Sequence, residues 1–190
     1  GDGGDEARRW SLSKPMGINR GLASSDQARA RLDEYRRRGE ESDAFAPWFS
    51  IDPPFPDGAF GDPKLVGGAY INGGIFPLVG GELARAALEH GREAFGVQIL
   101  RQYADLIRES GETYLWYFPD GRPSSEETST SPEAMATDGW GSSAMLFAFV
   151  EGLAGIVDDD RLLRRIRLAP RWPAAGVSEA SLTIAYGASA

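Results

Sequence analysis

The chain has 190 residues, a formal net charge of −8 and a hydrophobic content of 42%, values that suit one globular domain with a sizeable core. The acidic balance argues against partners such as nucleic acid or an anionic membrane surface, because both bind through clusters of basic side chains. There is no cysteine and only one histidine, which excludes disulfides, thiolate zinc sites and multi-histidine metal sites. We expect no cofactor.

The chain has no run of about 18 apolar residues, the length that a membrane-spanning helix needs. Its first ten residues, GDGGDEARRW, lack the basic start and the apolar stretch of a signal peptide. We therefore expect a cytoplasmic protein, and we interpret the chain as a fragment of a longer polypeptide.

The first helix is predicted over residues 25–38. Ser24 and Gln27 have the spacing of a capping box, apolar residues recur at helical spacing through the range, and Gly39 is expected to end the helix. Residues 40–68 then form a long irregular segment with five prolines. A segment this long is usually functional or disordered. We expect it to be folded over a cleft, because it contains the aromatic residues Phe45, Trp48, Phe49, Phe55 and Phe60.

The stretch GGAYINGGIFPLVGG, residues 67–81, places a glycine turn directly before a helix-forming run. Gly73 and Gly74 would let backbone N–H groups approach a ligand closely. Tyr70, Asn72 and Phe76 would surround that point with two flat rings and an amide, which suits a sugar. The alternative is a glycine turn that only joins two helices.

Three further helices are predicted, over 75–89, 92–110 and 138–153. The second has an apolar stripe opposite its charges, whereas the third is apolar nearly all round and should be buried. A second long loop, 112–137, separates these two helices. Strands are predicted over 165–168 and 182–186, where polar and apolar residues alternate.

Amphipathic helices thus alternate with apolar, small-residue helices. This is the pattern of an αα-hairpin repeated twice with a period of about 65 residues, the apolar helices lying inside a toroid and the long loops gathering at their N-terminal ends. The predicted fold class is mainly α, with hairpins over 1–157 and a β-rich element over 158–190.

Three segments resemble one enzyme family. YINGGIFPLVGG (70–81) resembles a Tyr-x-Asn-Gly-Gly-Ile-Trp-Pro motif of the six-hairpin, (α/α)6-barrel glycosidases and phosphorylases, with Phe76 in place of the tryptophan. DGWGSSAMLFAFVEGLAGI (138–156) resembles their last inner helix, and RIRLAPRWP (165–173) the first strand of their C-terminal β-sandwich. The resemblance covers about 67–175 and implies the C-terminal part of such a barrel, the rest being another segment or chain.

The resemblance also implies a reaction, the cleavage of glycosidic bonds in an oligosaccharide or glycoside substrate by inversion. Glu126, fourteen residues before Trp140, stands where glucoamylase-like and debranching-like members carry the general base, and Glu127 is the alternate. In mannosylglycerate-hydrolase-like members the aligned position is Trp116, which would leave no base, and phosphorylase-like members need none. The general acid would lie outside this chain.

Several candidate residues also have purely structural interpretations. Glu126 lies in a polar, serine-rich loop that is typical of an exposed segment, and Asp138 is expected to cap the last helix. Trp140 is either a sugar platform or core, and Trp48 and Trp116 are lid anchors or stacking surfaces. Two other functions stay open, a non-catalytic carbohydrate-binding module and a helical domain that associates through an apolar helix face.

Overall fold

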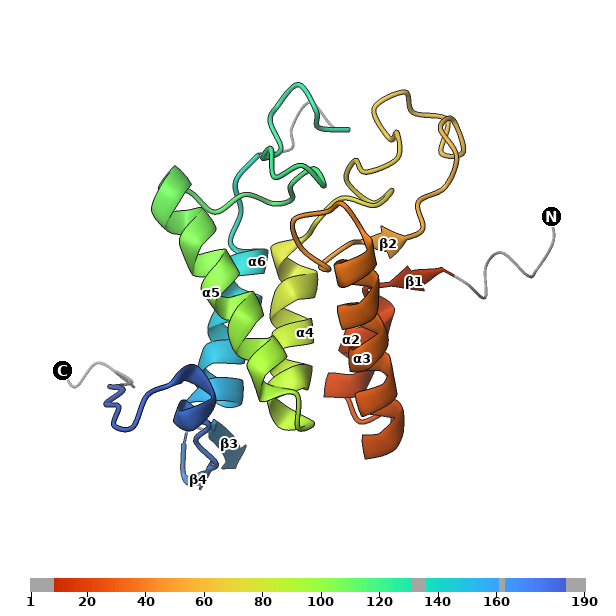
Figure 1. The fold of residues 1–190 in the computed structure, drawn as a ribbon. Helices are drawn as coiled ribbons and strands as arrows, with labels where there is room; N and C mark the ends of the chain where they lie inside the picture. The colour runs from red at the N-terminus through yellow and green to blue at the C-terminus, as the bar shows by residue number, and fades with distance from the viewer. Residues whose placement is uncertain (1–8, 131–135, 161–162, 184–190) are drawn as a thin grey trace.

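The computed structural model describes residues 9–130, 136–160 and 163–183, and its fold is mainly helical (Figure 1). The α-helices are α2 (Ser13–Asn19), α3 (Ser25–Glu41), α4 (Pro77–Glu89), α5 (Glu93–Ser110) and α6 (Trp140–Phe147), which continues into a π-helix, η1 (Ala148–Leu153). Two antiparallel strand pairs, β1 (Trp10–Ser11) with β2 (Ile51–Asp52) and β3 (Ile156–Asp160) with β4 (Arg165–Leu168), precede a 3-10 helix, η2 (Trp172–Ala175). Within these ranges, no helix combines the length and apolar character that crossing a bilayer requires.

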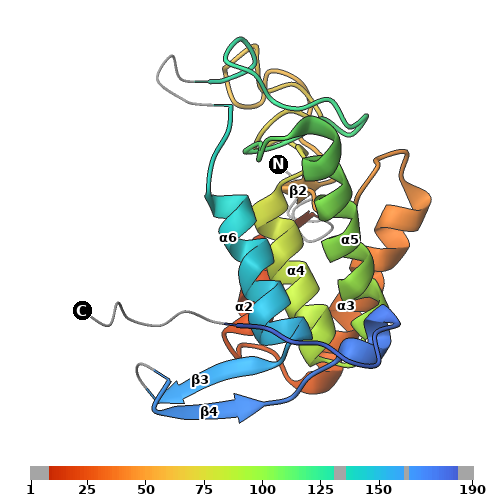
Figure 2. The ribbon, with the colours of Figure 1, turned by 90° about the vertical axis from the view of Figure 1, so that its left-hand side faces the viewer.

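The helices form two layers, with α2, α4 and α6 in one and α3 and α5 in the other (Figure 2). Two hydrogen bonds align α2 parallel to α4. At the start of α2, the Leu12 amide donates to the Ser50 carbonyl, which lies near the start of α4. At its end, Asn19 Nδ2 donates to the Glu82 carbonyl at 2.8 Å. Helix α6 also runs parallel to α4, whereas α5 follows α4 through a short turn at Gly91 and runs back.

Glycines let α4 and α6 approach closely. A Cβ built on Gly81 would lie 2.4 Å from the Ala144 carbonyl carbon, and one on Gly141 would lie 2.4 Å from Pro77 Cβ. Both distances are shorter than van der Waals contact, so only glycine fits at these two points. The small residues predicted for these helices therefore serve helix packing.

The predicted helices are present, with shifted ends. Helix α3 begins with the expected capping box, in which Ser24 Oγ accepts from the Gln27 amide and Gln27 Oε1 accepts from the Ser24 amide. The prediction that Gly39 ends this helix is wrong, because α3 continues to Glu41. A Cβ on Gly39 would lie 2.8 Å from Pro47 Cβ, so this glycine allows the following segment to pack on the helix.

The N-terminal helix boundary predicted at residue 75 is also shifted. Ile75 pairs as an isolated bridge with both Phe49 and Tyr117, and the helix starts at Pro77, whose fixed φ suits the first helical position. At the other end of the hairpin, Gly111 caps α5 with a left-handed φ of +72°.

The prediction that the last helix is buried on all sides is wrong for this structure. Trp140 is 69% exposed, Leu146 61% and Phe147 56%, while Met145 and Ala148 are buried against the core. Helix α4 has neighbours in its own layer on both sides, α2 and α6. Among the residues that the structure describes, α6 has only α4 beside it in this layer (Figure 2). The exposed surface of α6 that carries Trp140, Leu146 and Phe147 is therefore largely apolar, and we call it the bare side of α6.

The core lies between the two layers and around Trp48, which is fully buried. The Trp48 ring makes edge contacts with Phe45 and Tyr103, at centroid distances of 5.9 and 6.3 Å. The long segment after α3 is therefore folded onto the helices, and it contributes core side chains as well as surface.

The strand predicted over 165–168 is confirmed as β4, which pairs with β3. In the strand predicted over 182–186, residues 182–183 are not in a strand, and residues 184–186 lie outside the described residues. The C-terminal segment also packs on the helices, since Trp172 of η2 lies against the cluster of Leu88, Val97 and Leu153. The described part of this region is thus one hairpin and one helical turn.

Candidate functional site

The first residues of α4 and α6 meet at one end of the helix layer. The close approach of Gly141 to Pro77 brings these helix starts together, and the described parts of the two long loops, residues 42–76, 111–130 and 136–139, gather above them (Figure 1). Two hydrogen bonds link the loops. The Ile75 amide donates to the Tyr117 carbonyl and the Tyr117 amide donates to the Ile75 carbonyl, both at 2.8 Å. This end of the molecule therefore holds the predicted site residues.

The glycine turn is folded on itself. Gly68, Tyr70 and Gly73 have φ values of +89°, +40° and +102°, and such a backbone strains a residue other than glycine, here Tyr70. The Gly73 amide donates to Ser50 Oγ at 3.1 Å and the Gly74 amide to the Tyr70 carbonyl at 2.9 Å. The two amides expected to face a ligand are thus engaged inside the protein.

Asn72 organises the loop from within. Its side chain is fully buried, its Oδ1 accepts from the Phe55 amide at 2.7 Å, and its Nδ2 donates to the carbonyls of Phe55 and Leu65 at 3.1 and 3.0 Å. These bonds replace backbone pairing in a segment without regular structure. In this structure Asn72 therefore presents no polar atom at the surface.

The predicted aromatic contacts divide into buried and exposed rings. Trp48, Trp116 and Phe76 are 0%, 2% and 9% exposed, so they belong to the core. Of the two expectations for Trp48 and Trp116, burial contradicts a stacking surface and is compatible with an anchor of the loops. Tyr70 is half-buried and lies 5.4 Å from the Phe76 ring and 6.2 Å from the Trp116 ring. Trp140 alone among these rings is mostly exposed, at the start of α6.

The candidate bases lie on an exposed turn. Glu126 and Glu127 are both exposed, and the turn is closed by hydrogen bonds between Ser125 and Thr128, including a 2.8 Å bond from the Ser125 amide to Thr128 Oγ1. A side-chain hydrogen bond from Ser125 lowers the pKa of Glu127, and the positive charge of Lys64 lowers it further. Glu127 is therefore ionised at neutral pH.

Lys64 connects the two long loops, because its Nζ donates to the Ser129 carbonyl at 2.6 Å. Residue 64 belongs to the first loop and residue 129 to the acidic turn of the second. The bond places the turn with Glu126 and Glu127 next to the first loop. Nothing in the sequence pattern marked Lys64.

Asp138 has the structural role expected of it. Its Oδ1 accepts from the amides of Trp140 and Gly141 at 3.0 and 3.4 Å, which caps the start of α6. Nearby, burial raises the pKa of Tyr103, and the negative charge of Asp138 raises it further. Burial also raises the pKa of Tyr117, to about 12. These phenols stay protonated at any physiological pH.

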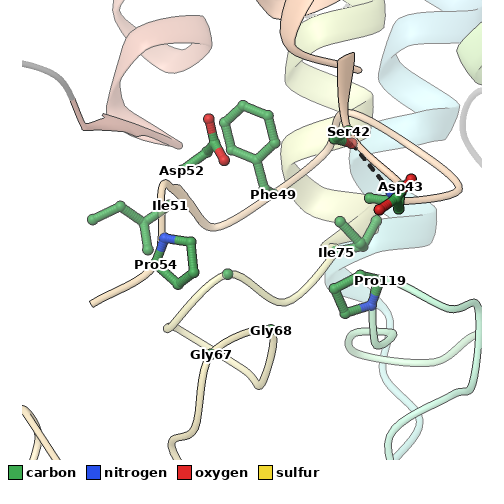
Figure 3. Close-up of a pocket in the computed structure, with 12 residues that line it drawn as sticks. Ser42, Asp43, Phe49, Ile51, Asp52, Pro54, Gly67, Gly68, Ile75 and Pro119 are labelled. Atoms are coloured by element: carbon green, nitrogen blue, oxygen red, sulfur yellow. Dashed lines mark hydrogen bonds between the residues drawn. The ribbon is translucent and has the colours of Figure 1, made fainter. Parts of the chain in front are cut away.

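A cavity of about 310 Å³ opens beside the end of α3 (Figure 3). It lies between the first loop, the glycine turn and one proline of the second loop. Gly73 is the only predicted site residue among its walls, which are formed by Ser42, Asp43, Ala44, Phe49, Ile51, Asp52, Pro54, Gly67, Gly68, Gly73, Ile75 and Pro119. Residues 40–68 were expected to fold over a cleft, and nine of the twelve wall residues belong to this range. Asp43 and Asp52 belong to no motif of the sequence.

The described ranges contain no candidate metal site, because no three His, Asp or Glu side chains there lie close enough together to hold an ion. Comparison of the sequence with models of known protein families gives no match, and comparison with curated proteins gives no significant match.

Proposed function

We propose that this chain is part of a six-hairpin, carbohydrate-active enzyme that cleaves glycosidic bonds by inversion. The observation that carries the proposal is the parallel, side-by-side packing of α4 and α6, whose starts meet at Pro77 and Gly141. The two family-like motifs, 70–81 and 138–156, lead into these two helices, and a toroid of αα-hairpins has this arrangement of inner helices. Helices α3 and α5, which form the second layer (Figure 2), would occupy the outer positions of such a toroid.

The bare side of α6 supports the same proposal. In a closed toroid each inner helix has an inner neighbour on both sides, as α4 has α2 and α6. The exposed side chains of Leu146 and Phe147 would then face a further hairpin, from another segment or chain. Single exposed apolar residues are common, but adjacent large ones on one helix face mark a surface that another element covers.

In this proposal the substrate is an oligosaccharide or glycoside bound over the starts of α4 and α6. Trp140 offers an exposed ring to a sugar there, and Tyr70 adds a half-buried one. Glu126, on its exposed turn, takes a proton from the attacking water. The protonated acid comes from outside this chain, at the separation of about 6.5–9.5 Å that inversion requires. A glycoside phosphorylase is the runner-up, since phosphate would attack without a base.

The test is a hydrolysis assay of the full-length protein on maltooligosaccharides and cellooligosaccharides, with the anomer of the product followed by NMR. Glu126→Gln should lower kcat by about 10²–10⁴-fold, the contribution of a general base. Glu127→Gln tests the alternate base in the same assay. Glu112→Gln, which changes another exposed glutamate of the second loop, is the control and should change kcat less than threefold.

Each other result has a definite meaning. Full activity of Glu126→Gln would remove this residue from the mechanism, and a loss confined to Glu127→Gln would assign the base to the alternate. Turnover only with inorganic phosphate would favour the phosphorylase. Sugar binding without any turnover would favour a non-catalytic carbohydrate-binding module.

A second candidate function is association through the bare side of α6, which the exposure of Trp140, Leu146 and Phe147 specifically favours. Sedimentation of this chain at micromolar to millimolar concentration tests it. The double variant Leu146→Lys/Phe147→Lys should abolish any concentration-dependent association, whereas a monomer at all concentrations would leave this surface to a hairpin elsewhere in the longer protein.

A further inference from the structure

The cavity beside the end of α3 has mostly apolar walls. Phe49, Ile51, Pro54, Ile75 and Pro119 surround it (Figure 3), and its volume is about 310 Å³. Ligand pockets in proteins measure about 300–1,000 Å³, so this one suits a single small ring or a short aliphatic chain. Burial of that apolar group would supply most of the binding free energy.

The backbone N–H groups of the glycine turn are already used. Gly67 donates to Asp57 Oδ1 at 2.8 Å, Gly68 to the Asn72 carbonyl at 2.8 Å, and Gly73 to Ser50 Oγ at 3.1 Å. These three glycines of the wall therefore offer no free N–H group of the kind that a glycine-rich loop offers to an anion. A phosphate or carboxylate would find no donor on this wall.

The charged groups of the cavity are carboxylates. Asp52 is paired with the Arg38 guanidinium, which leaves Asp43 as the other acid of the wall. In the part of the chain that the structure describes, the exposed Asp43 side chain makes no hydrogen bond or ion pair. Ser42 Oγ, beside it, already accepts from the Ala44 amide at 3.1 Å.

We propose that this cavity is a binding site for an apolar group that carries a positive charge, such as a cycloalkyl or alkyl ammonium ion. The ring or chain would lie between the apolar walls, and the ammonium group would pair with Asp43 at the rim. The inference is independent of the proposed glycosidase activity, because it depends only on this cavity and its carboxylate.

Titration of the ¹⁵N-labelled chain with cyclohexylammonium, followed by NMR, tests the proposal. The amide signals of Gly67, Gly68 and Gly73 report on the wall of the cavity directly. Cyclohexanol and cyclohexanecarboxylate have the same ring without the positive charge, and methyl glucoside represents a neutral sugar. We expect millimolar binding of the ammonium ion, weaker binding of the alcohol and none of the carboxylate.

Asp43→Asn keeps the shape of the side chain and removes its charge, and it should weaken ammonium binding about threefold to fivefold, as expected for a partly exposed ion pair. Asp26→Asn is the matched control. It removes one negative charge at the opposite end of α3, about 25 Å away, which is beyond the screening length of about 10 Å at 0.1 M salt.

Several outcomes would overturn the proposal. One is equal binding of the three cyclohexyl compounds, which would make the site purely apolar. A second is unchanged ammonium binding in Asp43→Asn. A third is the absence of any shift at the three glycines when the cyclohexylammonium concentration reaches about ten times the expected millimolar Kd. Preferential binding of methyl glucoside would instead make the cavity a sugar subsite.

Discussion

Gly81 of α4 lies directly against Ala144 of α6, so closely that a Cβ on the glycine would be 2.4 Å from the Ala144 carbonyl carbon and 2.6 Å from its Cβ. The contact is between two backbones, and neither can move without separating the helices. It therefore determines how near the two helix starts lie, and with them the loops above.

Gly81→Ala should destabilise the chain by about 2 kcal/mol, since overpacking usually costs about 1–3 kcal/mol and exceeds the gain of up to about 1 kcal/mol in helix propensity. Chemical denaturation measures the effect. Gly17→Ala in α2 is the control, because the nearest atom to its Cβ is Leu22 Cβ at 4.0 Å, and it should stabilise slightly. A neutral Gly81→Ala would contradict the proposed close packing.

Asn72→Ala should cost about 2–3 kcal/mol and loosen the first loop. The change removes three hydrogen bonds to the backbone of Phe55 and Leu65, and it leaves the buried Leu65 carbonyl and the partly buried groups of Phe55 without these partners. Limited proteolysis and hydrogen exchange should show new cleavage and faster exchange between residues 53 and 68. Unchanged protection of this segment would mean that the loop is held by other contacts.

Replacing Trp140 or Trp48 by alanine should have opposite consequences. Trp48→Ala should cost about 3–5 kcal/mol, because it removes a fully buried ring from the core. Trp140→Ala should change the unfolding free energy by less than about 0.5 kcal/mol, because the ring is mostly exposed, yet it should weaken sugar binding in the full-length protein. A large stability loss from Trp140→Ala in this chain would show that the ring is covered in solution.

The stability of α3 should fall in acid. Hydrogen bonds from Arg37 and Arg38 lower the pKa of Glu34 to about 2, against about 4.3 in an unfolded chain. Because the folded pKa is the lower one, this stabilisation is complete above about pH 4.3 and is lost as the pH falls toward 2. Denaturation of Glu34→Gln between pH 2 and 6 should show a slope shallower than that of the wild type, by about 1 kcal/mol over the range for a partly exposed group.

The helices were predictable because their signals are local. The capping box at Ser24 and the glycine at 111 depend on residues within one helical turn, and both are present. The prediction that Gly39 ends α3 is wrong for the opposite reason. The role of this glycine depends on its contact with Pro47, and local helix propensity carries no information about such a contact.

The candidate site was harder to predict than the fold. Glycines at 73 and 74 have the same sequence signature whether their amides face a ligand or close a turn, and here they close a turn. The exposure of Trp140 and the burial of Trp48 depend on which helix face has a neighbour, a property of the assembled layers. Lys64 and Asp43 carry no motif at all, so only their positions in space single them out.

The π-helix at the end of α6 has a consequence for evolution of the C-terminal region. Its wider turns, Ala148–Leu153, set the direction in which the chain leaves toward Gly155, which lies against the Ala169 carbonyl at the base of the β3–β4 hairpin. An α-helix turns by roughly 100° per residue, so deleting one residue here would send the hairpin out on another side of the molecule. Length changes should therefore be selected against in η1.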